Sequence, residues 1–96
     1  MEAIVHRLSG PLTIYEVAGL KDEVLKILEE TPGLILDCSE ASRCDTAFVQ
    51  MLCALSRTCV KRGLSFSLIP GPELSAAAMR IGLDLSEEIP VSGGEA

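Results

Sequence analysis

The stretch that decides the fold runs from Leu34 to Ala47 and reads LILDCSEASRCDTA. Its apolar start, Leu34 to Leu36, is too short for a helix and lacks polar alternation, which indicates a strand covered on both faces. A small polar loop is expected after Asp37, and Asp45 then precedes the most amphipathic segment, Phe48 to Arg62. The stretch predicts a buried strand, a loop and a helix that starts at Asp45, with any site placed at the loop and the first helical turn.

The helix after the loop carries signals at both ends. Asp45 is a natural N-cap, because its carboxylate can accept hydrogen bonds from the free N–H groups of a first helical turn. Gly63 follows two cations and suits the position just past a helix end. Between these ends, one apolar stripe is made of Phe48, Leu52, Leu55 and Cys59. The stripe should face the core, and Phe48 is expected to pack there.

The segment before this stretch predicts a hairpin and a helix. Residues 3–8 and 12–14 are interpreted as two short strands joined by the turn Ser9-Gly10-Pro11. Thr13 and Glu16 have the spacing of a capping box, so an amphipathic helix should begin there. It should end before Pro32, because proline disfavours a helical residue in front of it.

The segment after it predicts one more strand and one more helix. Residues 65–69 alternate and form the strand, and Pro72 suits the first position of a helix that Gly82 ends. The whole order implies an α/β fold: a small mixed sheet of four to five strands with an N-terminal hairpin and three to four helices, mainly on one side. Residues 1–86 are predicted to form a single domain, and residues 87–96 a flexible acidic tail.

The composition excludes several classes of function. The net charge is −6, with eight basic residues scattered along the chain, so no basic surface for nucleic acid or anionic lipid is expected. Three aromatic residues offer no stacking platforms for single-stranded nucleic acid. Neither a signal peptide nor an apolar run long enough to span a membrane is present, and the protein is predicted to be cytoplasmic.

Four cysteines and one histidine give no metal-binding pattern. None of Cys38, Cys44, Cys53 and Cys59 forms a C-x-x-C pair, and His6 is far away in the sequence. We expect no metal and no cofactor, and a structural role for the thiols. A redox or phosphoacceptor subunit that uses Cys38 or Cys44 is a separate alternative, which would require an exposed thiol with a low pKa.

The polar residues of the opening stretch favour binding over catalysis. Asp37 and Asp45 flank one loop, but the end of a strand and a helix cap account for them without chemistry. No nucleophile elbow, Walker loop or dinucleotide motif occurs, so the protein is predicted not to be an enzyme. Thr46 lies in a first helical turn, where a phosphate would be welcome, although Asp45 beside it would oppose the added charge.

The ordered set of these motifs resembles the STAS family, the domains of anti-sigma-factor antagonists. The set comprises LILDCS at 34–39, CDTA at 44–47, the following helix, Lys61-Arg62-Gly63, the strand at 65–69 and Ile81-Gly82-Leu83. Residues 12–15, reading LTIY, fit as well. The resemblance covers about residues 3 to 84 and implies a non-enzymatic module that binds proteins in bacterial signalling.

What the resemblance implies for the site is specific. In some members a partner kinase phosphorylates the second hydroxyl residue of the motif, and partners then switch. Here that position is Ala47, and the usual glycine is Phe48, which leaves Thr46 as the phosphorylation candidate. The Asp-Thr-Ala form is similar to chemotaxis-associated members and to the cytosolic STAS subunit of lipid-transport ABC systems, in which the threonine contributes to docking on the ATPase.

The expected partners are therefore proteins. An anti-sigma factor or serine-kinase-like ATPase, a chemotaxis protein and an ABC ATPase are the alternatives, and a weak homodimer through a sheet edge is left open. The residues expected to contact the partner are Ser42, Arg43, Cys44, Asp45, Thr46, Ala47 and Gln50.

Overall fold

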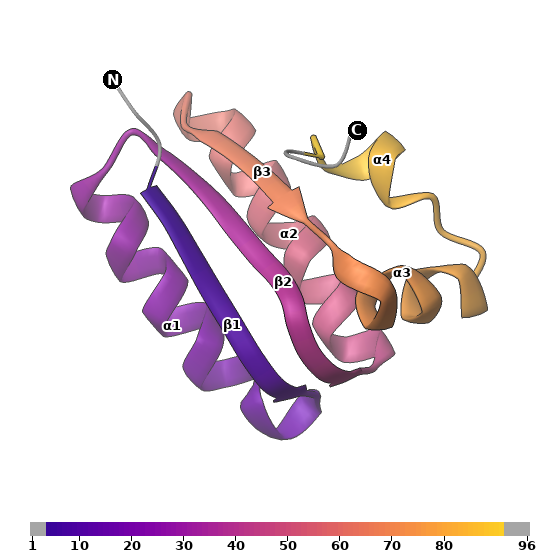
Figure 1. The fold of residues 1–96 in the computed structure, drawn as a ribbon. Coiled ribbons are helices and arrows are strands. Elements are labelled where there is room, and N and C mark those ends of the chain that lie inside the picture. The colour runs from indigo at the N-terminus through magenta and orange to yellow at the C-terminus, as the bar shows by residue number, and fades with distance from the viewer. Residues whose placement is uncertain (1–3, 92–96) are drawn as a thin grey trace.

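Strands and helices alternate along most of the chain. The computed structural model describes residues 4–91. Its elements are β1 (Ile4–Leu12), α1 (Ile14–Glu30), β2 (Gly33–Cys44), α2 (Thr46–Arg62), β3 (Ser65–Ile69), α3 (Gly71–Arg80) and α4 (Leu85–Glu88). Within the described part, the three strands form one parallel sheet in the order β1-β2-β3. Helices α1 and α2 lie together behind this sheet in Figure 1; α3 follows beyond the end of β3, and the chain then returns so that α4 lies beside β3.

The core lies between the sheet and this helical layer. The predicted stripe of α2 is buried, with Phe48 and Leu52 fully inaccessible to solvent. It belongs to one apolar cluster with Leu34 and Leu36 of β2 and Leu68 of β3. Aliphatic side chains from both layers therefore fill the interior, and the prediction for Phe48 is confirmed.

The predicted N-terminal hairpin is wrong. Residues 4–12 form one strand, which pairs in parallel with β2. The turn signal Ser9-Gly10-Pro11 appears as two irregularities in that pairing, and Gly10 adopts a φ of 77°. Because β1 is an edge strand, the missing N–H of Pro11 is tolerated, and the chain continues without reversing.

The predicted mixed sheet of four to five strands is wrong as well. The described residues contain three strands, all parallel, and one isolated bridge that joins Leu68 to Val91. The expected polar loop after Asp37 is strand: β2 extends to Cys44, because its second half pairs with the second half of β1. Ala41 and Cys44 are the buried residues of the second half of β2, and the residues between and before them in that half are exposed.

Helix α3 lies beside the second half of β2. Strand β3 pairs with β2 only up to Asp37, and the chain then turns into α3 at Gly71. Gly71 has a φ of 73°, and a Cβ there would lie 2.6 Å from the Cα of Ser39. Only glycine fits this turn without a shift, so the approach of α3 to β2 depends on it.

The helix ends match the sequence signals. Thr13 and Glu16 form the predicted capping box at the start of α1, Asp45 caps α2, and Gly63 closes α2 in a left-handed conformation. The four helices of the described region fall within the predicted three to four. None of them has the length and apolarity needed to cross a membrane.

The predicted acidic tail falls partly on described residues. Glu87 and Glu88 lie in α4, and Ile89 is buried in the core cluster. Residues 92–96 lie outside the described residues. The segment up to Ile89 is thus packed on the fold.

Candidate functional site

One carboxylate joins the first turns of α1 and α2. Asp45 Oδ1 accepts the N–H of Phe48 at 3.1 Å and caps α2. Asp45 Oδ2 accepts the N–H of Ile14, the first residue of α1, at 2.8 Å. The two helices therefore start side by side, at the edge of the sheet where β1 and β2 end with Leu12 opposite Cys44. The N-cap was predicted, and the second bond was not.

The paired helix starts expose an aromatic residue next to the threonine motif. Tyr15 is 91% exposed and Ile14 is 64% exposed, both in the first turn of α1. Thr46 is exposed as the first residue of α2. Exposed tyrosines are frequent anchors of protein interfaces. Sequence reasoning missed Ile14 and Tyr15. The capping box placed them in a first turn, but the pairing of β1 with β2 and the bond across 31 residues bring them to the motif.

The capping box keeps its acid ionised at this same edge. Glu16 Oε1 accepts the N–H of Thr13 at 2.8 Å and its hydroxyl at 2.7 Å. These bonds, the hydroxyl first, lower the pKa of the Glu16 carboxyl. Glu16 and Asp45 together give the helix starts two carboxylates, which satisfy free N–H groups there.

The other predicted contact residues divide between surface and interior. Ser42, Arg43 and Gln50 are exposed, and Ala47 is half-buried. Cys44 is only 8% exposed, so its side chain is not available to a partner. Its carbonyl oxygen accepts a hydrogen bond from Arg80 Nη2 at 3.5 Å. The residues predicted to contact a partner therefore lie at the surface, except for Cys44, whose side chain is buried.

Burial opposes reactivity of the cysteine thiols. All four cysteines are free and buried. Burial raises the pKa of Cys38 to about 12, and burial with the nearby Glu73 and Asp45 raises the pKa of Cys44 to about 11. A reactive cysteine needs an accessible thiolate. Cys38 and Cys44 are therefore neither exposed nor low in pKa, as a redox or phosphoacceptor subunit that used these thiols would require.

Asp37 and Asp45 have separate local partners. Asp37 lies inside β2 rather than at its end, with its side chain 7% exposed. Its carboxylate accepts the N–H of Ser39 at 2.9 Å and pairs with Arg7 Nε at 3.2 Å. The bonds from Ser39, followed by Arg7, lower the pKa of this carboxyl. Its ionised form stabilises the fold above the usual Asp range, and this stabilisation is lost as the pH falls through the lowered pKa.

A groove runs between α1 and α2 from the paired helix starts. Its volume is about 410 Å³. The lining residues come from the facing sides of the two helices: Val17, Lys21, Leu25, Ala47, Gln50, Met51, Ala54, Leu55, Thr58 and Arg62. We call this the α1–α2 groove. Two of the predicted contact residues, Ala47 and Gln50, lie at its start.

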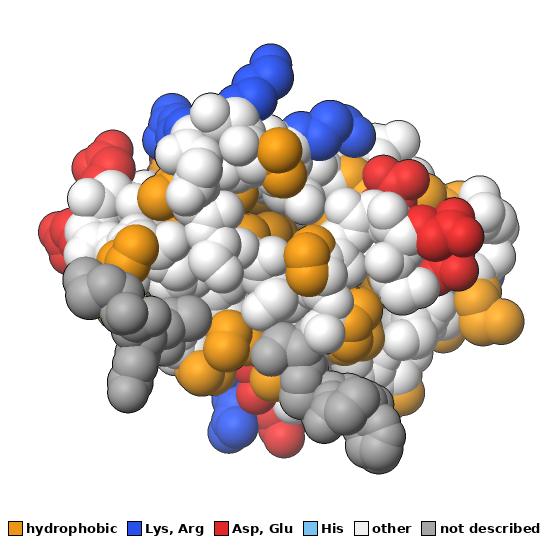
Figure 2. All heavy atoms as spheres, turned by 90° about the horizontal axis from the view of Figure 1, so that it is seen from above, with side chains coloured by type: hydrophobic (Ala, Val, Ile, Leu, Met, Phe, Trp, Pro, Cys, Tyr) orange, Lys and Arg blue, Asp and Glu red, His pale blue; other side chains and the backbone are white. Residues whose placement is uncertain are grey.

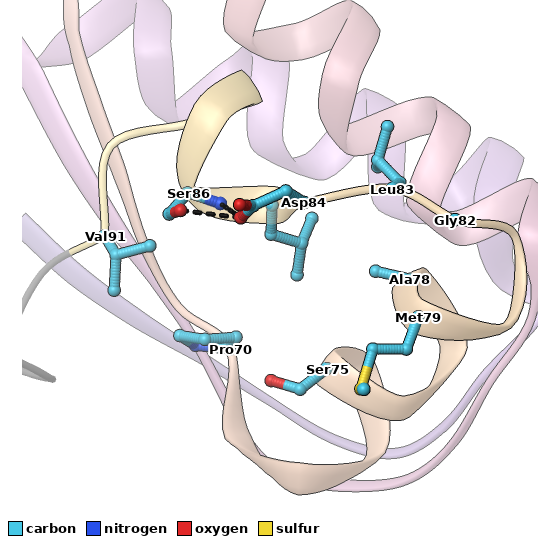
Figure 3. A pocket seen from close by; sticks show the side chains of 10 residues that line it. Pro70, Ser75, Ala78, Met79, Gly82, Leu83, Asp84, Ser86 and Val91 are labelled. Carbon is cyan, nitrogen blue, oxygen red and sulfur yellow. Dashed lines mark hydrogen bonds between the residues drawn. The ribbon is translucent and has the colours of Figure 1, made fainter.

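A second concavity lies between α3 and α4, and Figure 3 shows it from close by. Its volume is about 440 Å³. Ser75 and Met79 of α3 face Asp84 and Ser86 across it, and Asp84 Oδ1 accepts the N–H and the hydroxyl of Ser86. We call it the α3–α4 cleft. It contains none of the residues that the sequence predicted for partner binding.

Within residues 4–91, no three His, Cys, Asp or Glu side chains gather as a metal site would require. The candidate site consists of two surface features. One is the exposed tyrosine and threonine on the joined helix starts, and the other is the apolar groove that leads away from them.

Comparison with known proteins agrees with the motifs and the fold. A family model described as "Mlab, STAS domain" matches residues 2–87. A search of curated proteins found no match. The family match covers the sheet and all four helices except the last residue of α4. The chain therefore belongs to the STAS domain family.

Proposed function

We propose that the protein is a non-enzymatic docking module that binds a cytosolic ATPase through its joined helix starts. The observation that carries this proposal is the double hydrogen bond of Asp45, which joins the first turn of α2, with Thr46, to the first turn of α1, with Tyr15. We call the exposed surface formed by Ile14, Tyr15, Thr46, Ala47 and Gln50 the helix-start surface. A rigid base under an exposed aromatic residue lowers the entropy cost of binding.

The leading partner is the kinase-like ATPase of a bacterial partner-switching or chemotaxis-associated system. The family match and the resemblance of the motif Asp45-Thr46-Ala47 to signalling members support this proposal. Thr46 is the candidate for phosphorylation, since its hydroxyl is exposed at a helix start. A phosphate there would add charge next to Asp45 and would separate the partners.

A second candidate is the STAS subunit of a lipid-transport ABC system, docked on its ATPase. One observation favours it: Ala47 occupies the usual acceptor position, is half-buried and lines the α1–α2 groove. An alanine there supplies contact area without a switch. Docking through Thr46 would then be permanent, with the threonine acting by contact alone.

Affinity purification of the tagged chain from its own cells tests both candidates. We expect an ATPase in the eluate, and its type, kinase-like or ABC, decides between them. Mass spectrometry of the same sample measures phosphorylation of Thr46. Phosphorylated Thr46 with a kinase-like partner supports the switch, whereas unmodified Thr46 with an ABC ATPase supports permanent docking.

The change Thr46→Glu locates the interface. A carboxylate at the start of α2 suits the helix, so the fold should persist, but the charge should weaken binding about tenfold or more by entering a desolvated contact. The matched control is Ser65→Glu, an exposed residue where β3 begins, at the other end of the parallel sheet. Equal recovery of the partner by both variants would rule out the helix-start surface.

A further inference from the structure

The α1–α2 groove has the length and direction of a helix. Val17, Lys21 and Leu25 recur every four residues along α1, and the α2 residues run from Ala47 to Arg62. Fifteen residue steps of 1.5 Å make this lining about 22 Å long. A linear apolar groove between two helices suits an amphipathic helix, which inserts side chains at one-turn intervals.

The floor of the groove is apolar and rests on the core. Met51 and Leu55 are buried members of the core cluster, and Val17 and Leu25 are packed against it. Ala54 is exposed in the groove, and its small side chain does not fill it. Because Met51 and Leu55 are already buried, an incoming helix would cover other residues. These are exposed Ala54 and half-buried Val17 and Leu25, which rest on this floor. Covering apolar surface favours binding.

The charge of the groove is opposite to that of the chain. Its lining contains two charged residues, Lys21 and Arg62, which are both exposed. The ion pairs among residues 4–91 are His6–Glu23 and Arg7–Asp37, so these two cations pair with no described acid. The chain has 14 acidic and eight basic residues. In Figure 2, the Lys and Arg side chains gather mainly along the upper border, on the side of the helical layer.

We propose that the α1–α2 groove receives an acidic amphipathic helix of the partner protein. The apolar side chains of that helix lie over Ala54, between Val17 and Leu25, and its Asp and Glu residues pair with Lys21 and Arg62. This inference rests on the proposed function, because the groove begins at Ala47 and Gln50 of the helix-start surface. It adds the chemistry of the partner segment, and it makes recognition dependent on charge and on salt.

Reversal of the two cations tests the inference with the full chain. The double variant Lys21→Glu/Arg62→Glu should recover the partner about tenfold less well than the wild type, because each attractive pair becomes a repulsion. The matched control is Lys26→Glu/Lys61→Glu, which changes the same net charge on the same two helices at exposed positions outside the groove. Circular dichroism checks that both variants fold.

A photo-crosslinking amino acid in place of Ala54 identifies the occupant. A crosslinked partner peptide with apolar residues at helical spacing and several Asp or Glu residues supports the inference. A crosslink to a second copy of this chain, or to a segment without acids, overturns it, and so does equal recovery by the two double variants.

The outcomes also separate this inference from the proposed function. If Thr46→Glu loses the partner and Lys21→Glu/Arg62→Glu keeps it, the proposed docking through the helix-start surface is supported, and the inference that the groove receives an acidic helix fails. If no ATPase is recovered at all, the proposed function fails, and a designed helical peptide of about 16 residues tests the groove alone. A version with Leu on one face and Glu on the other must then bind the purified chain more tightly than its Lys counterpart, or the inference fails too.

Discussion

The two concave surfaces of this protein have similar volumes and opposite chemistry. The α1–α2 groove has about 410 Å³ and two cations, whereas the α3–α4 cleft has about 440 Å³ and the acid Asp84. Glu87 and Glu88 of α4 are exposed close to Asp84 in the sequence. Size does not distinguish the surfaces, but charge does. In an acidic chain, the unusual surface is the basic one.

The two surfaces also differ in how they are held. Both walls of the α1–α2 groove are 17-residue helices packed on the sheet. One wall of the α3–α4 cleft is α4, a helix of four residues, followed by the single bridge of Val91. Leu85 and Ile89 anchor this short segment in the core, and a segment with two such anchors opens locally at lower cost than a long packed helix. We therefore expect the groove to keep its shape when free and the cleft to vary more.

Two glycines provide the largest predicted contrast in stability. Gly71→Ala should destabilise the fold by about 3 kcal/mol, because a left-handed alanine is strained and its Cβ overlaps β2. The Cβ of Gly63→Ala, at the end of α2, would meet no atom within 4 Å. Its cost should be about 1 kcal/mol, from backbone strain alone. Urea unfolding measures both, and equal losses would show that α3 does not depend on this close approach.

Two capping aspartates provide a smaller contrast. Asp45→Ala removes the acceptor of two helix starts and should cost about 2 kcal/mol, at about 1 kcal/mol for each cap. Asp84→Ala removes the cap of α4 only and should cost about 1 kcal/mol or less. Asp45→Ala should also weaken docking, since Tyr15 and Thr46 lose their shared anchor.

A variant with one oxygen tests the same point more finely. Asp45→Asn keeps a single acceptor oxygen, so it can serve one helix start but not both. Its free energy of unfolding should lie between those of the wild type and Asp45→Ala. If Asp45→Ala costs no more than Asp84→Ala, the bond to Ile14 contributes nothing measurable, and the helix-start surface loses its physical basis.

Local signals of the sequence predicted the parts of the fold that depend on near neighbours. The capping box of Thr13 and Glu16, the cap at Asp45 and the stripe that begins at Phe48 each span a few turns of one helix. The physics of such features is contained in one segment, so periodicity and spacing are sufficient to find them.

Features that depend on distant partners were predicted wrongly or missed. Ser9-Gly10-Pro11 has the composition of a turn, but pairing with residues about 30 positions away keeps it in β1. For the same reason, the sequence predicted the residues that α2 contributes to the helix-start surface but missed those that α1 contributes. Thr46 follows from the motif, whereas Tyr15 joins it through the pairing of β1 with β2 and the second oxygen of Asp45. Long-range contacts of this kind have no local pattern.

The smallest expected effect on stability and on partner binding comes from charge reversal in α4, beside the acidic α3–α4 cleft. Reversing two exposed charges of α4, in the double variant Glu87→Lys/Glu88→Lys, should change stability by no more than about 0.5 kcal/mol. Recovery of the partner should stay within about twofold of the wild type, because Glu87 and Glu88 do not line the groove and charges outside a contact act mainly through screened fields. A strong loss of binding would mean that the partner also reaches α4, and the difference between the two surfaces would then describe one continuous interface with a basic and an acidic end.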